Sequence, residues 1–167
     1  AVIEFEPDGT IIMANDNFLD AMGYSLNEIK GKHHRMFVDP EYAASSEYSE
    51  FWRSLGKGEF KADQFVRFGK GGKEIWIQAT YNPVLNSKGN VIKVVKFAVD
   101  VTARKAEQER SSRIQTSLDC VSSSVMIADE NNVIMYCNPS VQAVLKEAES
   151  DIKKDLPYNF ELALTLA

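Results

Sequence analysis

Residues 8–15 read DGTIIMAN, and this stretch decides how the first part of the chain folds. The Pro-Asp-Gly sequence at 7–9 favours a tight turn, and short apolar runs at 1–5 and 10–14 flank it. The pattern therefore predicts a hairpin of two strands. Asn15 then stands where a helix can begin, because its side-chain oxygen can accept hydrogen bonds from the next backbone amides.

Beyond Asn15 the chain changes from helical to strand-like patterns. Apolar residues at helical spacing predict short helices up to a last one over 46–55. Three strand-like runs follow, at Phe60–Phe68, Glu74–Val84 and Val91–Val99, with Gly- and Asn-rich turns between them. The order predicts an α+β domain with an antiparallel sheet and helices on one face.

The residues after Thr102 have a different composition. Residues 103–121 contain many charged side chains and no Gly or Pro, which predicts an exposed linker helix. One apolar stripe runs along it, from Ile114 to Val125. We therefore divide the chain into a first domain at 1–102, a linker helix at 103–122 and a second unit at 123–167.

The second unit resembles the start of the first one at an offset of 123 residues. The matching residues are Ile11 with Ile134, Asn15 with Asn138, Ile29 with Ile152, and Lys30 with Lys153. Chance alignment of short amphipathic segments is the alternative interpretation. If the repeat is genuine, the second unit lacks the three long strands and cannot close a core of its own. We expect it to be partly disordered, packed on the first domain or dimerised.

Composition excludes several classes of protein. The net charge of −5 argues against binding to nucleic acid or to an anionic membrane, since both need a basic surface. The two cysteines, Cys120 and Cys137, lack metal-ligand spacing and fit a reducing cytoplasm. No apolar run approaches the ~20 residues of a membrane span. No nucleophile elbow, metal-binding motif or paired-cysteine motif appears, so we do not expect an enzyme.

Several segments together resemble the PAS domain family, in full over 1–102 and as a second copy over 120–160. They are residues 8–15, Phe18, 22–24, 28–29, 31–32, 51–55, 58–59, 72–77, 81–84 and 97–102. The similarity is greatest to PAS domains of methyl-accepting chemotaxis proteins, biofilm-dispersion regulators and aerotaxis transducers. The resemblance implies a five-stranded sheet, a ligand or cofactor cleft between sheet and helices, and signal exit through the C-terminal helix.

The resemblance implies a cytoplasmic sensory module. It would sense a small ligand or a redox or oxygen cue and relay it to a chemotaxis-type output, a downstream signalling domain of the same chain. Two alternatives stay open. One is a PAS module with an empty cleft that serves dimerisation or protein–protein interaction. The other is the sensor part of a histidine kinase or a cyclase.

By the same resemblance, five residues are candidates for cofactor binding: Asn15, His34, Trp52, Trp76 and Asn82. Indole rings can stack on a flavin, and an amide can bond its polar edge, so FAD is the first candidate cofactor. However, the Arg-His pair found before the proline in flavin-binding aerotaxis domains is Val38-Asp39 here. Haem held by His34 is less favoured, and the absence of any cofactor is the third alternative.

The remaining expectations concern the core, the metal and the exit helix. Adjacent His33 and His34 cannot both bind one metal from a helix, so no metal site is expected. Asp100 and Thr102 are candidates for a junction at which hydrogen bonds fix the start of the exit helix to the sheet. A homodimer through the outer face of the sheet and the 114–125 stripe is also expected. The predicted pocket and core residues are Ile11, Met13, Phe18, Phe65, Trp76, Tyr81 and Phe97.

Overall fold

The structure, a computed structural model, describes residues 1–155, with side chains up to residue 149. The chain divides into two compact units, Ala1–Ala106 and Glu107–Ala167. The last part of the predicted second domain, 156–167, lies outside the described residues, as do the side chains of Ile152 and Lys153.

The first unit contains two strands, a series of short helices and three longer strands. In chain order these are β1 (Val2–Phe5), β2 (Ile11–Ala14), α1 (Asp16–Met22), α2 (Leu26–Ile29), the 3-10 helix η1 (His34–Phe37), α3 (Pro40–Ala43), α4 (Ser46–Gly56), β3 (Lys61–Phe68), the 3-10 turn η2 (Lys70–Gly72), β4 (Glu74–Leu85) and β5 (Val91–Asp100). The helix α5 (Thr102–Asp119) follows β5 after one residue.

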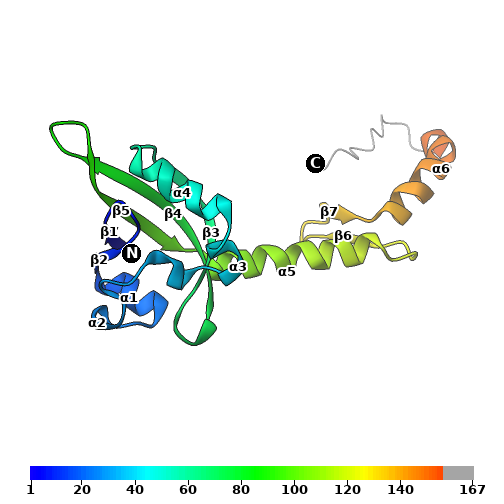
Figure 1. The fold of residues 1–167 in the computed structure, drawn as a ribbon. Coiled ribbons are helices and arrows are strands. Elements are labelled where there is room, and N and C mark those ends of the chain that lie inside the picture. Colours follow the sequence, from blue (N-terminus) through cyan, green and yellow to red (C-terminus); the bar gives the residue numbers. More distant parts are fainter. Residues whose placement is uncertain (156–167) are drawn as a thin grey trace. The chain divides into compact units, whose positions relative to one another are not determined.

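The strands form one antiparallel sheet in the order β2-β1-β5-β4-β3. The segment with α1 to α4 covers one face of it (Figure 1). The predicted α+β architecture is therefore confirmed. Because β5 lies between β1 and β4, the N-terminal hairpin completes a sheet whose other strands begin only at Lys61.

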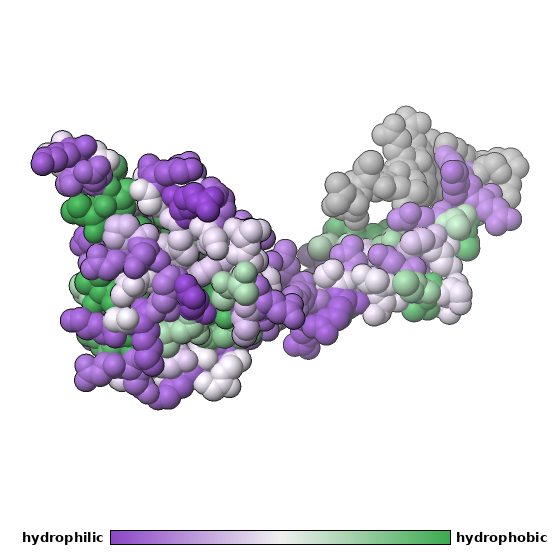
Figure 2. All heavy atoms as spheres, viewed as in Figure 1, coloured by the Kyte–Doolittle hydropathy of each residue, from purple (hydrophilic) through white to green (hydrophobic). Residues whose placement is uncertain are grey.

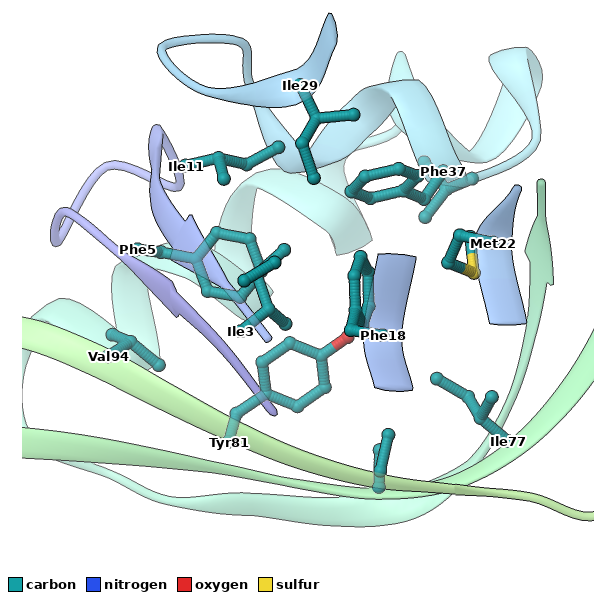
Figure 3. Close-up of a cluster of buried hydrophobic side chains, with 14 of the residues drawn as sticks. Ile3, Phe5, Ile11, Phe18, Met22, Ile29, Phe37, Ile77, Tyr81 and Val94 are labelled. Carbon is teal, nitrogen blue, oxygen red and sulfur yellow. The ribbon is translucent and has the colours of Figure 1, made fainter. Parts of the chain in front are cut away.

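The core lies between the sheet and the helices (Figure 3). On β4 the inward side chains alternate with outward ones, so Ile75, Ile77 and Tyr81 are buried, as the period-two pattern predicts. Helix α1 contributes Phe18 and Met22, four residues apart on one face. The predictions for Ile11, Phe18 and Tyr81 as core residues are confirmed, and Phe65 is half-buried.

Met13 and Phe97 were wrongly predicted to lie in the core. Met13 is 44% exposed and Phe97 is 53% exposed. Phe97 faces outward because of the register of β5, in which Val94, Lys96 and Ala98 face inward. On β2 the buried residues are Ile11 and Ala14, and Met13 lies on the other face. Hydrophobic side chains also reach the surface beside the β4–β5 hairpin, where Leu85 and Ile92 are about half exposed (Figure 2).

Asn15 joins the hairpin to the first helix. Its side-chain Oδ1 accepts hydrogen bonds from the Val2 amide at 2.9 Å and from the Phe18 amide at 3.1 Å. Its own amide donates to the Val2 carbonyl at 3.0 Å. One side chain thus satisfies a free amide of the helix and one of the strand, which holds α1 against the start of β1.

The second unit repeats this arrangement at the predicted offset. It contains β6 (Met126–Ala128), β7 (Ile134–Cys137) and α6 (Pro139–Asp155). Asn138 Oδ1 accepts from the Val125 amide at 3.0 Å and the Val141 amide at 3.1 Å, and these partners are also displaced by 123 residues. The same contacts at the same offset confirm the repeat, because chance similarity of sequence would not reproduce them.

The two copies differ after their first helix. In the first copy Gly23 adopts a left-handed conformation with φ of 74° and ends α1, and Ser25 starts α2. The corresponding residues are Lys146 and Ala148, which continue a helix well, so α6 runs on without a break.

Few side chains of the second unit are buried. Among residues 107–149 only Asn138 and Val141 are buried, whereas apolar residues of both short strands are exposed. This agrees with the expectation that a unit without the three long strands has little core. Within residues 1–155, no helix combines the length and the apolar character that crossing a membrane requires.

Replacing Asn15 by alanine should destabilise the first unit. The Asn15→Ala substitution leaves two backbone amides without their acceptor, so we expect the free energy of unfolding to fall by about 1–3 kcal/mol. Urea unfolding followed by tryptophan fluorescence measures this, since both tryptophans lie in this unit. The control is Asn17→Ala, at an exposed position of the same helix. Equal losses in both variants would contradict the role of Asn15.

Candidate functional site

The structure places the five predicted cofactor residues in three separate locations. His34 and Trp52 lie in the core under the sheet. Asn15 uses its side-chain oxygen for the backbone contacts of the hairpin and α1. Trp76 and Asn82 are on the opposite, outer face of β4, because they alternate with the buried Ile75, Ile77 and Tyr81. The structure therefore does not bring these five residues together.

Local contacts hold both outer-face residues. The Trp76 Nε1 donates to Glu74 at 3.1 Å, and the Lys105 ammonium lies 4.8 Å from the centre of a Trp76 ring. Asn82 Nδ2 donates to Thr80 Oγ1 at 3.1 Å and to the Val95 carbonyl at 3.2 Å.

The backbone before η1 brings His33 and His34 to the hairpin turn. Thr10 forms a bridge with His33, and the His34 amide donates to the Gly9 carbonyl at 2.9 Å. Gly9 is required here, because a Cβ at this position would lie 2.8 Å from a Trp52 ring carbon and 2.9 Å from the His33 ring. The glycine of the opening stretch therefore lets two aromatic side chains approach the turn.

His34 is completely buried between two tyrosine hydroxyls. Its Nδ1 is 3.0 Å from the Tyr48 hydroxyl, and its Nε2 is 3.0 Å from the Tyr81 hydroxyl. Arg67 Nη2 in turn donates to the Tyr81 hydroxyl at 3.0 Å. Rings of Phe5 and Trp52 pack edge-on against His34, with centroids 5.4 Å away in both cases.

These partners assign a direction to the hydrogen bonds. Arg67 can only donate, so Tyr81 accepts from it and donates its own proton to His34 Nε2. A neutral His34 then donates from Nδ1 to Tyr48. His33 Nε2 donates to the Asp8 carbonyl at 2.7 Å, which leaves its Nδ1 as acceptor for the Tyr48 hydroxyl at 3.4 Å. The chain of donors runs from Arg67 to the hairpin turn.

Burial sets the charge states along this chain. Burial, followed by the nearby charges of Arg67 and Lys96, holds the pKa of His34 well below its ordinary value of 6.5. Burial also raises the pKa of Tyr48 to about 12 and raises the pKa of Tyr81. Near neutral pH the imidazole is therefore uncharged and both hydroxyls keep their protons.

Two buried cations beside this cluster were missed in the sequence. Lys96 is 1% exposed and Arg67 is 4% exposed, and both project from strands toward the core. The Lys96 ammonium is 4.9 Å from the centre of the Tyr81 ring. The signal in the sequence was the alternation Val94-Lys96-Ala98, but the more hydrophobic set Val95-Phe97-Val99 pointed to the opposite orientation.

The sheet is bonded to the exit helix through Thr102. The Trp76 amide donates to Thr102 Oγ1 at 3.0 Å, and the Val101 amide donates to the Trp76 carbonyl at 2.8 Å. Asp100 accepts from the Thr102 amide at 2.8 Å and from its hydroxyl at 2.6 Å. The first residue of α5 is thus fixed to β4 as well as to β5.

This arrangement agrees with comparisons with known proteins. Residues 11–98 match the PAS fold family, and residues 112–165 match a second PAS domain family. The chain belongs to the PAS family. The biofilm dispersion protein BdlA of Pseudomonas aeruginosa is 42% identical over 120 residues, which are 70% of this chain and 29% of BdlA.

Two further comparisons place this PAS chain. The methyl-accepting chemotaxis protein McpB of Pseudomonas aeruginosa is 45% identical over 60 residues, 36% of this chain and 9% of McpB. A light-oxygen-voltage domain solved in a study with a flavin analogue is 23% identical with a TM-score of 0.54, covering 69% of this chain and 87% of that one. The chain is related to chemotaxis-type PAS proteins but spans less than a third of either curated relative.

The residues present do not fit a flavin or a haem in the way the resemblance implied. Trp76 and Asn82 cannot contact a flavin that also contacts His34 and Trp52, since the sheet separates them. For a haem, both ring nitrogens of His34 are occupied by tyrosine hydroxyls at 3.0 Å, so no lone pair is free for iron. The interior of this PAS domain is instead a polar cluster closed by aromatic rings.

Acid should destabilise this PAS domain partly through His34. The unfolded imidazole binds a proton below about pH 6.5, whereas the buried one resists it, so stability falls as pH drops through that value. We expect the urea midpoint to fall between about pH 7.5 and pH 5.5. This one proton lowers the free energy of unfolding by at most about 1.4 kcal/mol per pH unit.

The His34→Gln variant tests this, because glutamine can still donate and accept but does not titrate in this range. It should lose less stability over the same pH interval than the unsubstituted chain. His33→Gln is the comparison: burial lowers the pKa of the half-buried His33 as well, but less than that of His34, so this variant should lose nearly as much stability in acid as the unsubstituted chain. If His34→Gln lost as much stability in acid as the parent chain, the neutral buried imidazole would not be the cause.

Proposed function

We propose that this chain is a cytoplasmic PAS sensory module that binds a small molecule rather than catalysing a reaction. Binding in the polar cluster under the sheet would change the position of α5, and α5 would pass the change to a chemotaxis-type signalling domain of the same protein. The observation that carries the proposal is the bonded junction of Trp76, Asp100 and Thr102, because it couples the sheet directly to the helix.

The physical basis is the shortness of this connection. Only Val101 separates the end of β5 from the start of α5, and its amide is itself bonded to β4. A shift of the sheet therefore cannot be absorbed by a flexible loop and must reach the first turn of the helix. A ligand that stabilises one arrangement of sheet and helix would bias the output between two states. Similarity to BdlA and McpB supports this type of output.

Thr102→Val should uncouple the helix from the sheet. The substitution removes the acceptor of the Trp76 amide and loosens the first turn of α5, where the Lys105 amide donates to the Val101 carbonyl. We therefore expect amide exchange at Trp76 and Lys105 to accelerate about 5- to 30-fold, measured by hydrogen–deuterium exchange. In the full-length protein, the response of the signalling output to its stimulus should be lost. Thr116→Val, at an exposed position of the same helix, should change neither property. A full response in a protein with a loosened junction would contradict the proposed relay.

We also propose that the module is a homodimer through the outer face of the sheet. Phe97 and Val99 lie on that face and are 53% and 65% exposed, which is unusual for large apolar side chains on a central strand. A two-fold contact would place this patch against its own copy. The apolar stripe that begins at the exposed Ile114 would form a separate dimer contact. This association is also what the alternative of a PAS module without a ligand would require.

Phe97→Glu should weaken this dimer. A buried charge at the centre of an apolar contact is unfavourable, so we expect the dimer dissociation constant to rise about 30-fold or more, measured by sedimentation equilibrium. Phe60→Glu is the matched control, because Phe60 is 70% exposed but precedes β3 outside the sheet. If sedimentation equilibrium gave the same fall in average molar mass for Phe97→Glu and Phe60→Glu, or no fall for either, an interface at this face would be contradicted.

A further inference from the structure

The face of the sheet that packs against the helices carries a lysine without a hydrogen-bond partner. Lys96 lies on the central strand β5, and 1% of its surface is exposed. Its ammonium is 4.9 Å from the ring centre of Tyr81 and 5.8 Å from that of Phe18, so its neighbours are aromatic faces. Among the described residues, Lys96 Nζ takes part in no side-chain hydrogen bond or ion pair, whereas Lys93 on the same strand is paired with Glu4. A buried ammonium normally has several oxygen partners.

Arg67 lies on the same side and is also incompletely bonded. Its Nη1 donates to the Val66 carbonyl at 2.7 Å and its Nη2 to the Tyr81 hydroxyl at 3.0 Å. Its Nε is buried and has no partner among the described residues. Lys96 and Arg67 both contact Tyr81, so two positive side chains with unused donors lie around one tyrosine.

No negative side chain balances these charges. The buried polar residues within 1–149 are His34, Ser54, Arg67, Lys96 and Asn138, and none of them is acidic. Burial, and then repulsion by Arg67, lower the pKa of Lys96 well below its ordinary value. Two like charges in an apolar interior are unfavourable for folding. An arrangement of this kind is expected where the missing anion comes from outside the chain.

We propose that the site binds a small organic acid, with its carboxylate between Lys96 Nζ and Arg67 Nε and its apolar part against the surrounding rings. The inference rests on the sensory function proposed above and names its ligand class. A carboxylate matches the planar edge of a guanidinium, and one negative charge beside an ammonium completes the pairing. Inorganic phosphate has no apolar part to place against the surrounding rings. The rings of Phe18, Phe65 and Tyr81 favour an apolar body.

Binding at this place would act directly on the output. Lys96 pairs with Ile3 of β1 and with Tyr81 of β4, and it is four residues before Asp100 at the junction. Because Lys96 is closed off from solvent, the acid can reach it only when the helical layer moves away from the sheet. Occupation of the site is therefore linked to the relative position of helices and sheet.

The test uses the whole chain and four probes: benzoate, butyrate, the uncharged benzamide, and inorganic phosphate. We expect benzoate or butyrate to raise the midpoint of thermal unfolding in a concentration-dependent manner. Benzamide has the shape of benzoate without its charge and should give no shift, and phosphate should give none. No shift with either carboxylate, or an equal shift with benzamide or phosphate, would overturn the proposal.

Variants separate binding from stability. Lys96→Met should weaken the carboxylate about 30-fold or more and should raise the unfolding midpoint of the ligand-free chain, because methionine removes an unpaired buried charge. Arg67→Met should also weaken binding and provides a second variant if the first does not fold. Lys93→Met, on the same strand but paired with Glu4, should bind as the parent does. A Lys96→Met chain that is less stable and binds benzoate unchanged would show a purely structural lysine.

The outcomes also separate this inference from the proposed sensory function. If carboxylates do not bind but Thr102→Val still abolishes the response of the full-length protein, only the ligand class is wrong. If carboxylates bind in a Lys96-dependent manner but the junction variant responds normally, the site stands and the relay through α5 is wrong.

Discussion

Backbone pairing of β5 with β1 on one side and β4 on the other determines most of what this PAS module can do. The pairing closes the sheet between segments far apart in the chain. It also sets which side chains of β5 face the helices, because a shift of one residue would exchange the two faces. The observed register puts Lys96 inside and Phe97 outside. The pairing of β5 therefore explains why a lysine lies in the core and why a large apolar side chain lies on the outer face of the sheet.

The interior therefore differs from an ordinary hydrophobic core. A ring-lined cluster holds a neutral His34 between Tyr48 and Tyr81, and Arg67 completes the hydrogen bonds of Tyr81. The donors run in one direction, from Arg67 through Tyr81, His34 and Tyr48 to the hairpin turn. The same residues leave no free nitrogen on His34 for a haem.

The two PAS copies show what the three long strands contribute. Both copies form a hairpin whose asparagine, Asn15 or Asn138, bonds a strand amide and a helix amide in the same way. Within the described residues, 1–155, the first copy alone continues into three further strands, β3, β4 and β5, and buries an extensive core. The hairpin and cap are therefore local structures that the sequence can form by itself, whereas the sensor requires strands that return from a distance.

The sequence by itself determined the α+β layout, the hairpin at residues 7–9, the repeat at an offset of 123 and the start of the exit helix near Thr102. These follow from turn residues, caps and periodicity, which act over a few residues. Only the tertiary structure decided the face of each strand, and therefore that Trp76 and Asn82 lie outside while Lys96 and Arg67 lie inside. On β5 both alternate sets are largely apolar, so local pattern favours neither face strongly. The neighbouring strands and the helical layer, brought together from distant parts of the chain, make that choice.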